Sequence, residues 1–198
     1  MIKTTDMIIN ELSIYASPRT KLSRMVKKGE IFPIIKGLYE TEKSTPGFLL
    51  AGSIYGPSYI SFEYALSFYG LIPEAVYTVT SATFEKKKSK KYETMFGTFT
   101  YRDVPSEVFP LGLKIMKEDA YYYRIASPEK AVCDILYTLP PASNVEELHL
   151  LLNDSLRIDD SDLMKLNTVT IIELSKHYHS TNMKRLCILI KRLHKSIE

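Results

Sequence analysis

The chain has 198 residues, of which 45% are hydrophobic and 25% are charged, and its formal net charge is +3. This balance is typical of a globular protein and excludes a disordered chain, a collagen-like repeat and a coiled coil. Its 2 cysteines are too few for a disulfide framework or a structural zinc site. The apolar runs fall far short of the ~20 residues that cross a bilayer, and the first residues are too polar for a secretory signal, so we expect a cytoplasmic protein with no membrane partner.

Residues 1–43 are predicted to form a small helical unit. Apolar residues at helical spacing indicate a first helix over 5–15. A second helix is predicted to begin at Ser17 and Pro18, because serine caps helices and proline suits the first helical position, where no amide hydrogen is needed. Gly29 is expected to end this helix, since glycine readily adopts the left-handed conformation that closes a helix.

A β-hairpin and a linker are expected to follow the second helix. Residues 31–35 and 38–39 are β-prone and flank a turn at Lys36 and Gly37, which is the pattern of a short hairpin. Residues 41–47 contain Ser, Thr, Pro and Gly and are predicted to be a linker.

The rest of the chain is predicted to contain a mixed α/β domain over 48–140 and a helical extension over 141–198. Runs of β-branched and aromatic residues indicate strands, and Ser61 and Ser127 are placed to begin helices. The expected elements are a helix after Ser61, a strand at 76–80, a charged loop at 86–91, a hairpin over 92–104, a strand at 121–125, a helix after Ser127 and a last helix over 182–195.

The second helix is the most informative element for function. Leu22, Met25 and Val26 form its apolar side, and its opposite side is polar and cationic. Such a helix with a β-hairpin behind it is typical of a winged helix-turn-helix, in which one helix enters the major groove of DNA. The alternative is a plain amphipathic helix whose Lys and Arg side chains are only solvated. The candidate DNA-binding residues are Thr20, Arg24, Lys27 and Lys28 on the helix and Lys36 at the hairpin tip.

Two further basic regions are less specific. Residues 85–91 contain a run of lysines, and the last helix carries Lys and Arg on one side. Either region could follow a phosphate backbone. We favour the interpretation that both are solvated surfaces, since basic side chains near a helix end commonly complement its dipole.

Signals for catalysis are poor. His177 and His179 are two residues apart, so a helix would direct them to opposite sides and away from a shared metal ion. Cys133 is expected to be a partly buried, inert thiol within a helix. Glu129 is better explained by the start of that helix than by a metal-dependent nuclease motif. We therefore expect no enzyme, no metal and no cofactor, with a divergent nuclease as a weaker alternative.

Several segments, in their order along the chain, carry a family resemblance. They are Leu22–Gly29 with Gly37–Tyr39, Tyr59–Ser61 with the helix that ends at Gly70, Val76–Thr80, and Tyr123–Asp134. The first is similar to the winged helix of AbiEi-type antitoxins from bacterial type IV toxin–antitoxin systems. The others are similar to the second domain of that family, and together the segments cover about residues 18–138.

The resemblance implies a transcriptional regulator that represses its own operon. In that family the winged helix binds inverted repeats in promoter DNA, and the C-terminal part counters a nucleotidyltransferase-like toxin encoded beside it. The same five residues, from Thr20 to Lys36, then match the recognition helix and the wing tip. A helix-turn-helix normally has three helices before its wing, whereas this chain leaves room for two.

These observations together predict an α/β (α+β) protein. Its parts are a reduced winged helix-turn-helix at 1–43, a mixed α/β domain at 48–140 and a helical C-terminal extension at 141–198. The alternative function is a protein-interaction antitoxin module with a vestigial winged helix and no specific DNA binding.

Overall fold

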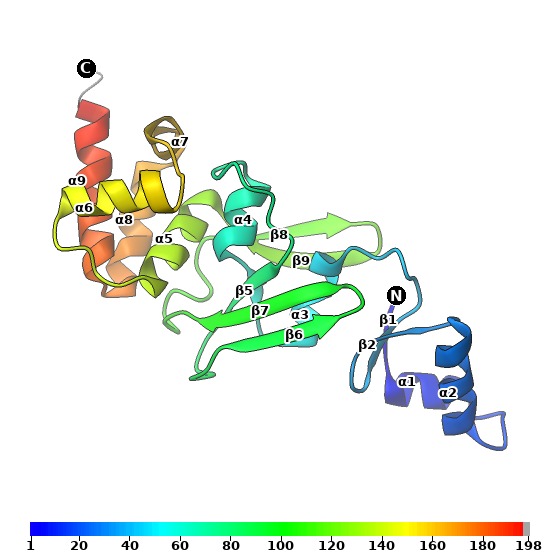
Figure 1. The fold of residues 1–198 in the computed structure, drawn as a ribbon. Coiled ribbons are helices and arrows are strands. Elements are labelled where there is room, and N and C mark those ends of the chain that lie inside the picture. The colour runs from blue at the N-terminus through cyan, green and yellow to red at the C-terminus, as the bar shows by residue number, and fades with distance from the viewer. Residues whose placement is uncertain (196–198) are drawn as a thin grey trace.

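The computed structural model describes residues 1–195 and has a mixed α/β fold, as the sequence predicts. Figure 1 shows three parts that follow one another along an elongated molecule. Two N-terminal helices lie at one end, a six-stranded sheet lies in the middle, and the helices of the C-terminal third lie at the other end. Every helix within residues 1–195 is too short or too polar to traverse a lipid bilayer.

The N-terminal part combines two helices with a three-stranded antiparallel sheet. Its elements are β1 (Ile2–Thr4), α1 (Thr5–Glu11), α2 (Pro18–Lys28), β2 (Phe32–Ile35) and β3 (Leu38–Glu40). The strand order is β1-β3-β2, so β3 pairs with the strand that precedes the helices and with the strand that follows them. Ile8, Leu12, Leu22 and Ile31 form a small core of their own.

This part differs from the prediction at three points. Helix α1 ends at Glu11 and not at residue 15, because Ile14 and Tyr15 are 86% and 45% exposed and do not continue its buried side. The sequence does not predict β1, since a strand of 3 residues contains too little pattern. Ser17 precedes α2, but its hydroxyl bonds the hydroxyl of Thr20 at 2.8 Å and does not cap a helix amide.

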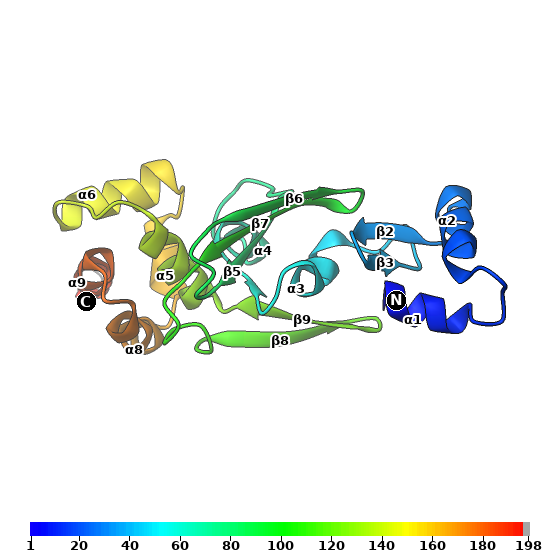
Figure 2. The same ribbon diagram turned by 90° about the horizontal axis from the view of Figure 1, so that it is seen from below.

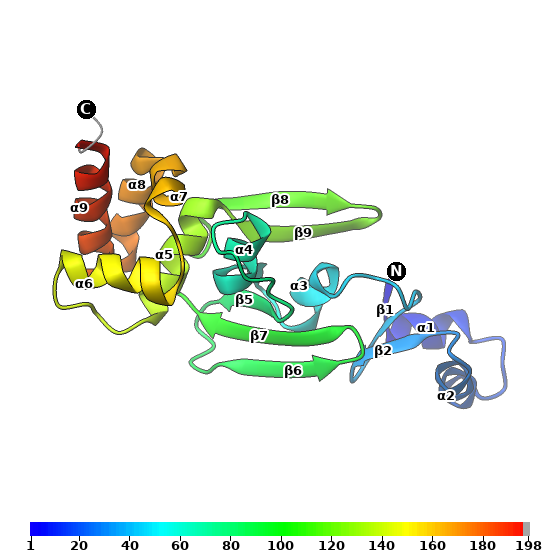
Figure 3. The same cartoon turned by 45° about the horizontal axis from the view of Figure 1, so that its top comes forward.

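The middle part is a mixed sheet with the strand order β6-β7-β5-β4-β9-β8. Its strands are β4 (Tyr59–Ile60), β5 (Val79–Thr83), β6 (Lys90–Thr94), β7 (Gly97–Asp103), β8 (Leu113–Glu118) and β9 (Tyr121–Ala126). The edge pairs β6-β7 and β8-β9 are antiparallel hairpins, and both extend toward the N-terminal part (Figure 3). The pairs β5-β7 and β4-β9 are parallel.

Short helices lie on both faces of this sheet. On one face are η1 (Gly47–Leu50) and α3 (Ala51–Ile54), and the Tyr101 hydroxyl donates a hydrogen bond to the Ala51 carbonyl at 2.7 Å. On the other face is α4 (Phe62–Phe68), where Arg102 pairs with Glu63. Successive side chains of a strand point to opposite faces of the sheet. Because Tyr101 contacts α3 and Arg102 contacts α4, these two helices lie on opposite faces. Helix α5 (Pro128–Thr138) packs beside α4.

The middle part corrects two predicted boundaries. The strand expected at 76–80 lies at Val79–Thr83, because these residues can pair with β4 on one side and β7 on the other. Lys90 and Lys91 belong to β6 and not to the charged loop. The sequence also does not predict β4, which has 2 residues, or β8, an edge strand whose lysines interrupt its apolar pattern.

The C-terminal part is helical, as expected. Its elements are α6 (Val145–Leu150), a π-helical segment (Leu151–Ser155), α7 (Asp160–Lys165), α8 (Thr168–Tyr178) and α9 (Thr181–Lys195). Helix α5 packs against α8 and α9 as well as α4, so it joins the sheet to the helices that follow.

Candidate nucleic-acid interface

Helix α2 has the two-sided character that the sequence predicts. Leu22 is 6% exposed, and Met25 and Val26 pack against the same small core. The helix ends at Gly29, whose φ of 69° lies in the left-handed region that glycine adopts without strain. One side of α2 therefore packs against the small core, and the opposite side is exposed and can contact a ligand.

The predicted DNA-binding residues are all exposed: Thr20, Arg24, Lys27 and Lys28 on α2 and Lys36 in the β2–β3 turn. The side chains of Arg24 and Lys27 form no hydrogen bond or ion pair with any residue in the described part of the chain. The Lys28 ammonium is 3.9 Å from the Glu30 carboxylate, which is a loose and exposed pair. A polyanion could approach this side of α2 without displacing a strong internal contact.

Helix α2 lies at the outer end of the molecule (Figures 1 and 2). In both views the three-stranded sheet lies between α2 and the six-stranded sheet. The cationic side of α2 is therefore not covered by the larger part of the protein.

Lys36 lies apart from the cations of α2. The turn that contains it is at the end of β2 that is remote from α2, and the Thr5 amide bonds the Gly37 carbonyl at 3.0 Å, beside the beginning of α1. In Figure 2 this turn is on the side of the six-stranded sheet, whereas α2 is on the far side. The structure thus brings the four α2 residues together but not Lys36, whose phosphate contact stays a prediction.

The other two basic regions have different surroundings. In the loop before β6, the Lys86 ammonium lies 5.3 Å from the ring centroid of Tyr55. In α9, Arg192 forms an ion pair with Glu146 of α6 at 2.8 Å. Some basic groups of these regions therefore hold neighbouring segments together, which distinguishes them from Arg24 and Lys27.

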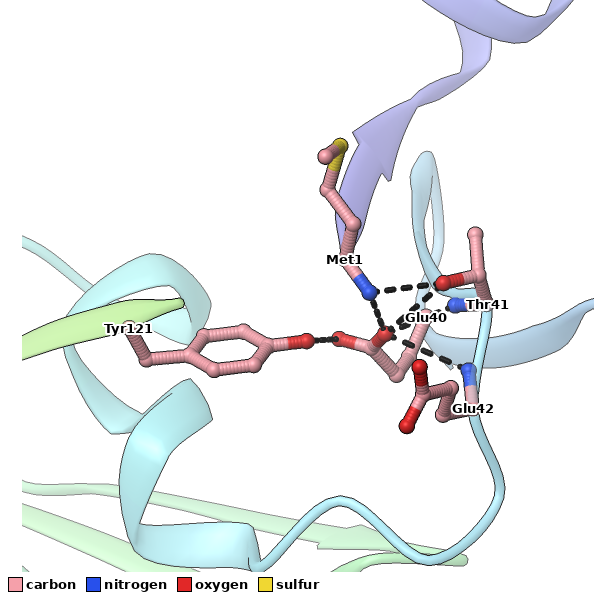
Figure 4. A network of polar contacts seen from close by, with 5 residues as sticks. All are labelled: Met1, Glu40, Thr41, Glu42 and Tyr121. Atoms are coloured by element: carbon pink, nitrogen blue, oxygen red, sulfur yellow. Dashed lines mark hydrogen bonds and ion pairs between the residues drawn. The ribbon is translucent and has the colours of Figure 1, made fainter. Parts of the chain in front are cut away.

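A buried carboxylate connects the N-terminal part to the six-stranded sheet (Figure 4). Glu40, the last residue of β3, is fully buried. One of its oxygens accepts a hydrogen bond from the Tyr121 hydroxyl, at the start of β9, at 2.8 Å. The other accepts from the N-terminal amine of Met1 and from the amides of Thr41 at 2.8 Å and Glu42 at 3.3 Å.

Hydrogen bonds keep the Glu40 carboxylate ionised. Burial raises its pKa, but the bonds from the N-terminal amine, the Tyr121 hydroxyl and the two amides outweigh burial, so the pKa of Glu40 lies below its usual 4.5. Burial and then the bond to Glu40 raise the pKa of Tyr121 to about 12. Tyr121 therefore stays protonated and donates to a charged acceptor at neutral pH.

Residues 41–46 connect β3 to η1 without helix or strand, and this segment is packed against its surroundings. Thr45 is buried. A Cβ atom on Gly47 would lie 2.3 Å from the carbonyl oxygen of Phe96, in the turn between β6 and β7, so glycine is required at this close approach. The N-terminal part thus meets the β8-β9 hairpin through Glu40 and Tyr121, and the connecting segment that follows reaches the β6-β7 hairpin at Gly47 and Phe96.

A second buried polar cluster surrounds α5. Lys130 and Asp134 are one turn apart and form an ion pair at 3.1 Å. Asp134 also accepts hydrogen bonds from the hydroxyls of Tyr59 at 2.9 Å, Ser61 at 2.6 Å and Tyr178 at 2.6 Å. All five side chains are at most 2% exposed. Because the partners come from β4, the start of α4 and α8, the cluster joins the sheet to the C-terminal helices.

The sequence analysis does not find this cluster. Burial lowers the pKa of Lys130, although the Asp134 charge opposes that effect. Burial and the Asp134 charge raise the pKa of Tyr59 and of Tyr178, so both hydroxyls remain donors. The available signal is the spacing of Lys130 and Asp134, four residues apart on one helix, but such pairs usually lie on a protein surface.

The structure changes one statement about the candidate catalytic residues. His177 Nδ1 and His179 Nε2 lie 4.0 and 3.6 Å from the same Glu107 carboxylate oxygen, so the two rings share a side. The reason is that α8 ends at Tyr178 and His179 has a left-handed φ of 51°. Residues 1–195 contain no group of three potential ligands that could hold a metal ion. Cys133 is fully buried, and burial raises the pKa of its thiol.

Comparisons with known proteins do not assign a family. No protein-family model matches the chain, and no curated protein matches it. The interpretation of α2 therefore depends on its geometry and on the resemblance described above.

Proposed function

We propose that this protein is an antitoxin-like transcriptional regulator that binds promoter DNA of its own operon through α2. The observation that carries this proposal is the outer side of α2, where Arg24 and Lys27 are exposed and have no partner among residues 1–195. The second half of the proposal, that the protein counteracts a nucleotidyltransferase-like toxin encoded nearby, is supported by the family resemblance alone.

The topology of the N-terminal part supports DNA binding. We interpret a strand, two helices and a hairpin with the strand order β1-β3-β2 as a winged helix that lacks its first helix, with α2 in the place of the recognition helix. In this proposal Arg24 contacts base edges, and a good bidentate contact of this kind is worth about 1–3 kcal/mol of discrimination. Lys27 and Lys28 would then contact phosphates and position the helix.

A double charge reversal tests the proposed interface. Full-length Arg24→Glu/Lys27→Glu should lose at least about 100-fold in affinity for the DNA upstream of its gene, because two attractive charges become repulsive. Fluorescence anisotropy with labelled duplexes at several salt concentrations measures both the affinity and its salt dependence. Circular dichroism should show an intact fold, since neither residue belongs to the small core.

The matched control carries the same charge change on α9. Lys184 and Lys191 are exposed, and Lys184→Glu/Lys191→Glu alters the net charge equally. This variant should bind promoter DNA nearly as tightly as the wild type. Equal losses in both variants would show that binding depends on total charge and not on α2, and unchanged affinity in the α2 variant would refute the proposal.

Co-expression tests toxin antagonism separately. The α2 variant should still restore growth of cells that express the neighbouring toxin, because α2, which carries both substitutions, lies at the end of the molecule opposite the C-terminal helices. If neither the wild type nor the variant restores growth, the antitoxin half of the proposal is wrong, whatever the DNA result.

One observation favours the alternative of a protein-interaction module. The N-terminal part has two helices before its hairpin, whereas a helix-turn-helix normally has three before its wing. A vestigial unit of this kind would bind promoter and unrelated duplexes with the same affinity. Specific binding, at least about tenfold tighter for the promoter, would exclude the alternative.

A further inference from the structure

Strand β8 forms one edge of the six-stranded sheet. In the strand order it has β9 on one side and no strand on the other. Figures 2 and 3 show β8 along the margin of the sheet, where no other element of residues 1–195 runs beside its outer side. An open edge of 6 residues is a template for pairing with a further strand. The proposed DNA contacts on α2 do not use this edge.

The backbone groups of alternate residues point out of this edge. The Ser127 amide donates to the Gly112 carbonyl at 2.8 Å, in register with the β8–β9 ladder. Hydrogen-bonded and non-hydrogen-bonded pairs alternate in an antiparallel ladder. The amides and carbonyls of Leu113, Ile115 and Lys117 are therefore directed away from β9, toward the open side. A strand that pairs with β8 must bond these three residues.

Two opposite charges lie on one face of β8. The Lys114 ammonium is 5.1 Å from the ring centroid of Tyr69, at the end of α4, and Glu118 shares this face because it is four residues further along the strand. Both side chains are exposed, and the Glu118 carboxylate forms no ion pair with any residue between 1 and 195. A strand rises about 3.3 Å per residue, so the two charges are about 13 Å apart and do not pair within one chain.

The charges of β8 are self-complementary in one antiparallel register. With Met116 opposite the same residue of a second copy, Lys114 lies opposite Glu118 of that copy and the reverse pair forms as well. The outward-directed residues Ile115 and Lys117 then exchange the backbone hydrogen bonds. A register with Lys117 opposite itself would bring like charges together, and one with Ile115 opposite itself would place Lys114 opposite an apolar residue.

We infer that β8 pairs with β8 of a second copy of this chain, antiparallel and with Met116 on the twofold axis. The two six-stranded sheets then become one continuous sheet. Such an interface is isologous, so the Lys114–Glu118 pair occurs twice. The opposite edge is less suited, because on β6 the Lys91 ammonium already pairs with Glu93 of the same strand at 2.6 Å. The inference does not depend on the proposed DNA binding.

Sedimentation equilibrium of the full chain tests the inference. The wild type should show a monomer–dimer equilibrium with a Kd below about 100 µM, as expected of a small interface. Lys114→Glu places carboxylates opposite one another, and Glu118→Lys places ammonium groups opposite one another, so each should weaken the dimer at least about tenfold. Lys114→Glu/Glu118→Lys restores both pairs and should return the Kd to within about threefold of the wild type.

Two further variants separate pairing from charge and from folding. Lys91→Glu is the matched control, since it makes the same change in net charge on the other edge strand and should leave the Kd unchanged. Ile115→Pro keeps every charge but removes an outward-directed amide, so it should leave the protein monomeric. Proline is tolerated on edge strands where the amide does not face the neighbouring strand, so circular dichroism should show an intact fold.

Disulfide formation tests the register. Met116→Cys in a Cys187→Ser background should give a covalent dimer under mild oxidation, because facing residues of a non-hydrogen-bonded pair lie close enough for a disulfide. The native Cys133 is buried and does not compete. Ile115→Cys in the same background should crosslink at least about tenfold more slowly, because Lys117 of the second copy faces it.

Each contrary outcome decides against the inference. A chain that stays monomeric at about 200 µM would overturn it, as would an unchanged Kd in the two single charge variants. Failure of the double exchange to restore the dimer would refute the Lys114–Glu118 pair. Faster crosslinking of Ile115→Cys than of Met116→Cys would refute the register, and an equal loss in Lys91→Glu would show a nonspecific effect of charge.

Discussion

Helices α2 and α5 begin with the same Ser-Pro sequence, but α2 is largely exposed and α5 is largely buried. Each has 11 residues, with a serine before it and a proline at its first position. In α5 every residue from Lys130 to Leu136 is buried, whereas in α2 only Leu22 is buried. Lys130 directs its charge inward to Asp134, while Arg24 and Lys27 direct theirs to solvent.

The difference shows that the start of a helix is determined by neighbouring residues in the sequence, whereas its burial is determined by the distant elements that pack around it. Helix α5 packs against α4, α8, α9 and β9, whereas the apolar side of α2 packs in the small core with α1, Ile31 and Tyr39. An enclosed cation must be paired, so loss of its partner destabilises the fold, and the cation cannot meet a ligand. An outward cation contributes little to stability and remains available for a polyanion.

The largest effect that would test this comparison is expected from Asp134→Asn. The variant leaves the Lys130 charge buried without its counter-ion and places an amide opposite three hydroxyl donors, so it should lose about 3–5 kcal/mol of unfolding free energy. Urea denaturation measures the loss. Arg24→Gln on α2 is the control and should change the unfolding free energy by less than about 0.5 kcal/mol. Similar small changes in both variants would contradict the assigned difference.

A pH-dependent effect is expected where the N-terminal part meets the larger sheet. The pKa of Glu40 is lowered in the folded state, so its ionised form stabilises the protein above the ordinary pKa of 4.5, and this contribution is lost as the pH falls through the lower folded value. Glu40→Gln should therefore destabilise the protein at about pH 7 and much less at about pH 3. Glu42→Gln, at an exposed position, is the control. A difference from wild type that is constant with pH would contradict the role of the Glu40 charge.

A smaller difference in stability is expected between alanine substitutions of the two serines that precede α5 and α2. The Ser127 hydroxyl accepts a hydrogen bond from the Lys130 amide at 3.2 Å, so Ser127→Ala should lose about 1 kcal/mol. The Ser17 hydroxyl caps no amide, so Ser17→Ala should lose only a few tenths of a kcal/mol. Thermal and urea unfolding of both variants measure the difference, and equal losses would show that Ser17 also acts as a cap.

The smallest effect is expected from Lys36→Ala. If the β2–β3 turn contacts one phosphate, the slope of log affinity against log salt should decrease by about 0.9, with a several-fold loss of affinity at low salt. Lys184→Ala on α9 is the matched control and should leave the slope unchanged. An unchanged slope for Lys36→Ala would restrict the DNA interface to α2.

The sequence predicts an element accurately when the residues that determine it lie within a few positions of one another. Helix α2, the hairpin after it and α5 are found where expected, because Pro18, Gly29, Lys36 with Gly37 and Ser127 act within a few residues. Strand β1 is not predicted, because its formation depends on pairing with β3 and not on its own 3 residues. The same reason explains β4, which is placed by its pairing with β5 and β9.

The candidate site was predictable to the same extent. The exposed side of α2 follows from helical geometry, which places Arg24 and Lys27 opposite Leu22. The position of Lys36 relative to α2 was not predictable, since it depends on the direction in which the hairpin leaves the helix. The buried cluster around Asp134 was also hidden, because its hydroxyl partners come from β4, the start of α4 and α8.

By itself, the sequence determined the mixed α/β class, the limits of α2 and the separation of its apolar and cationic sides, because these depend on residues within a few turns of one another. Only the tertiary structure decided which charges are buried and which remain free. Glu40 is held by Tyr121, 81 residues away, and Lys130 is bonded by Tyr178, 48 residues away. Such contacts exist only after the chain has folded, since no local pattern specifies which distant residue will complete a buried polar group.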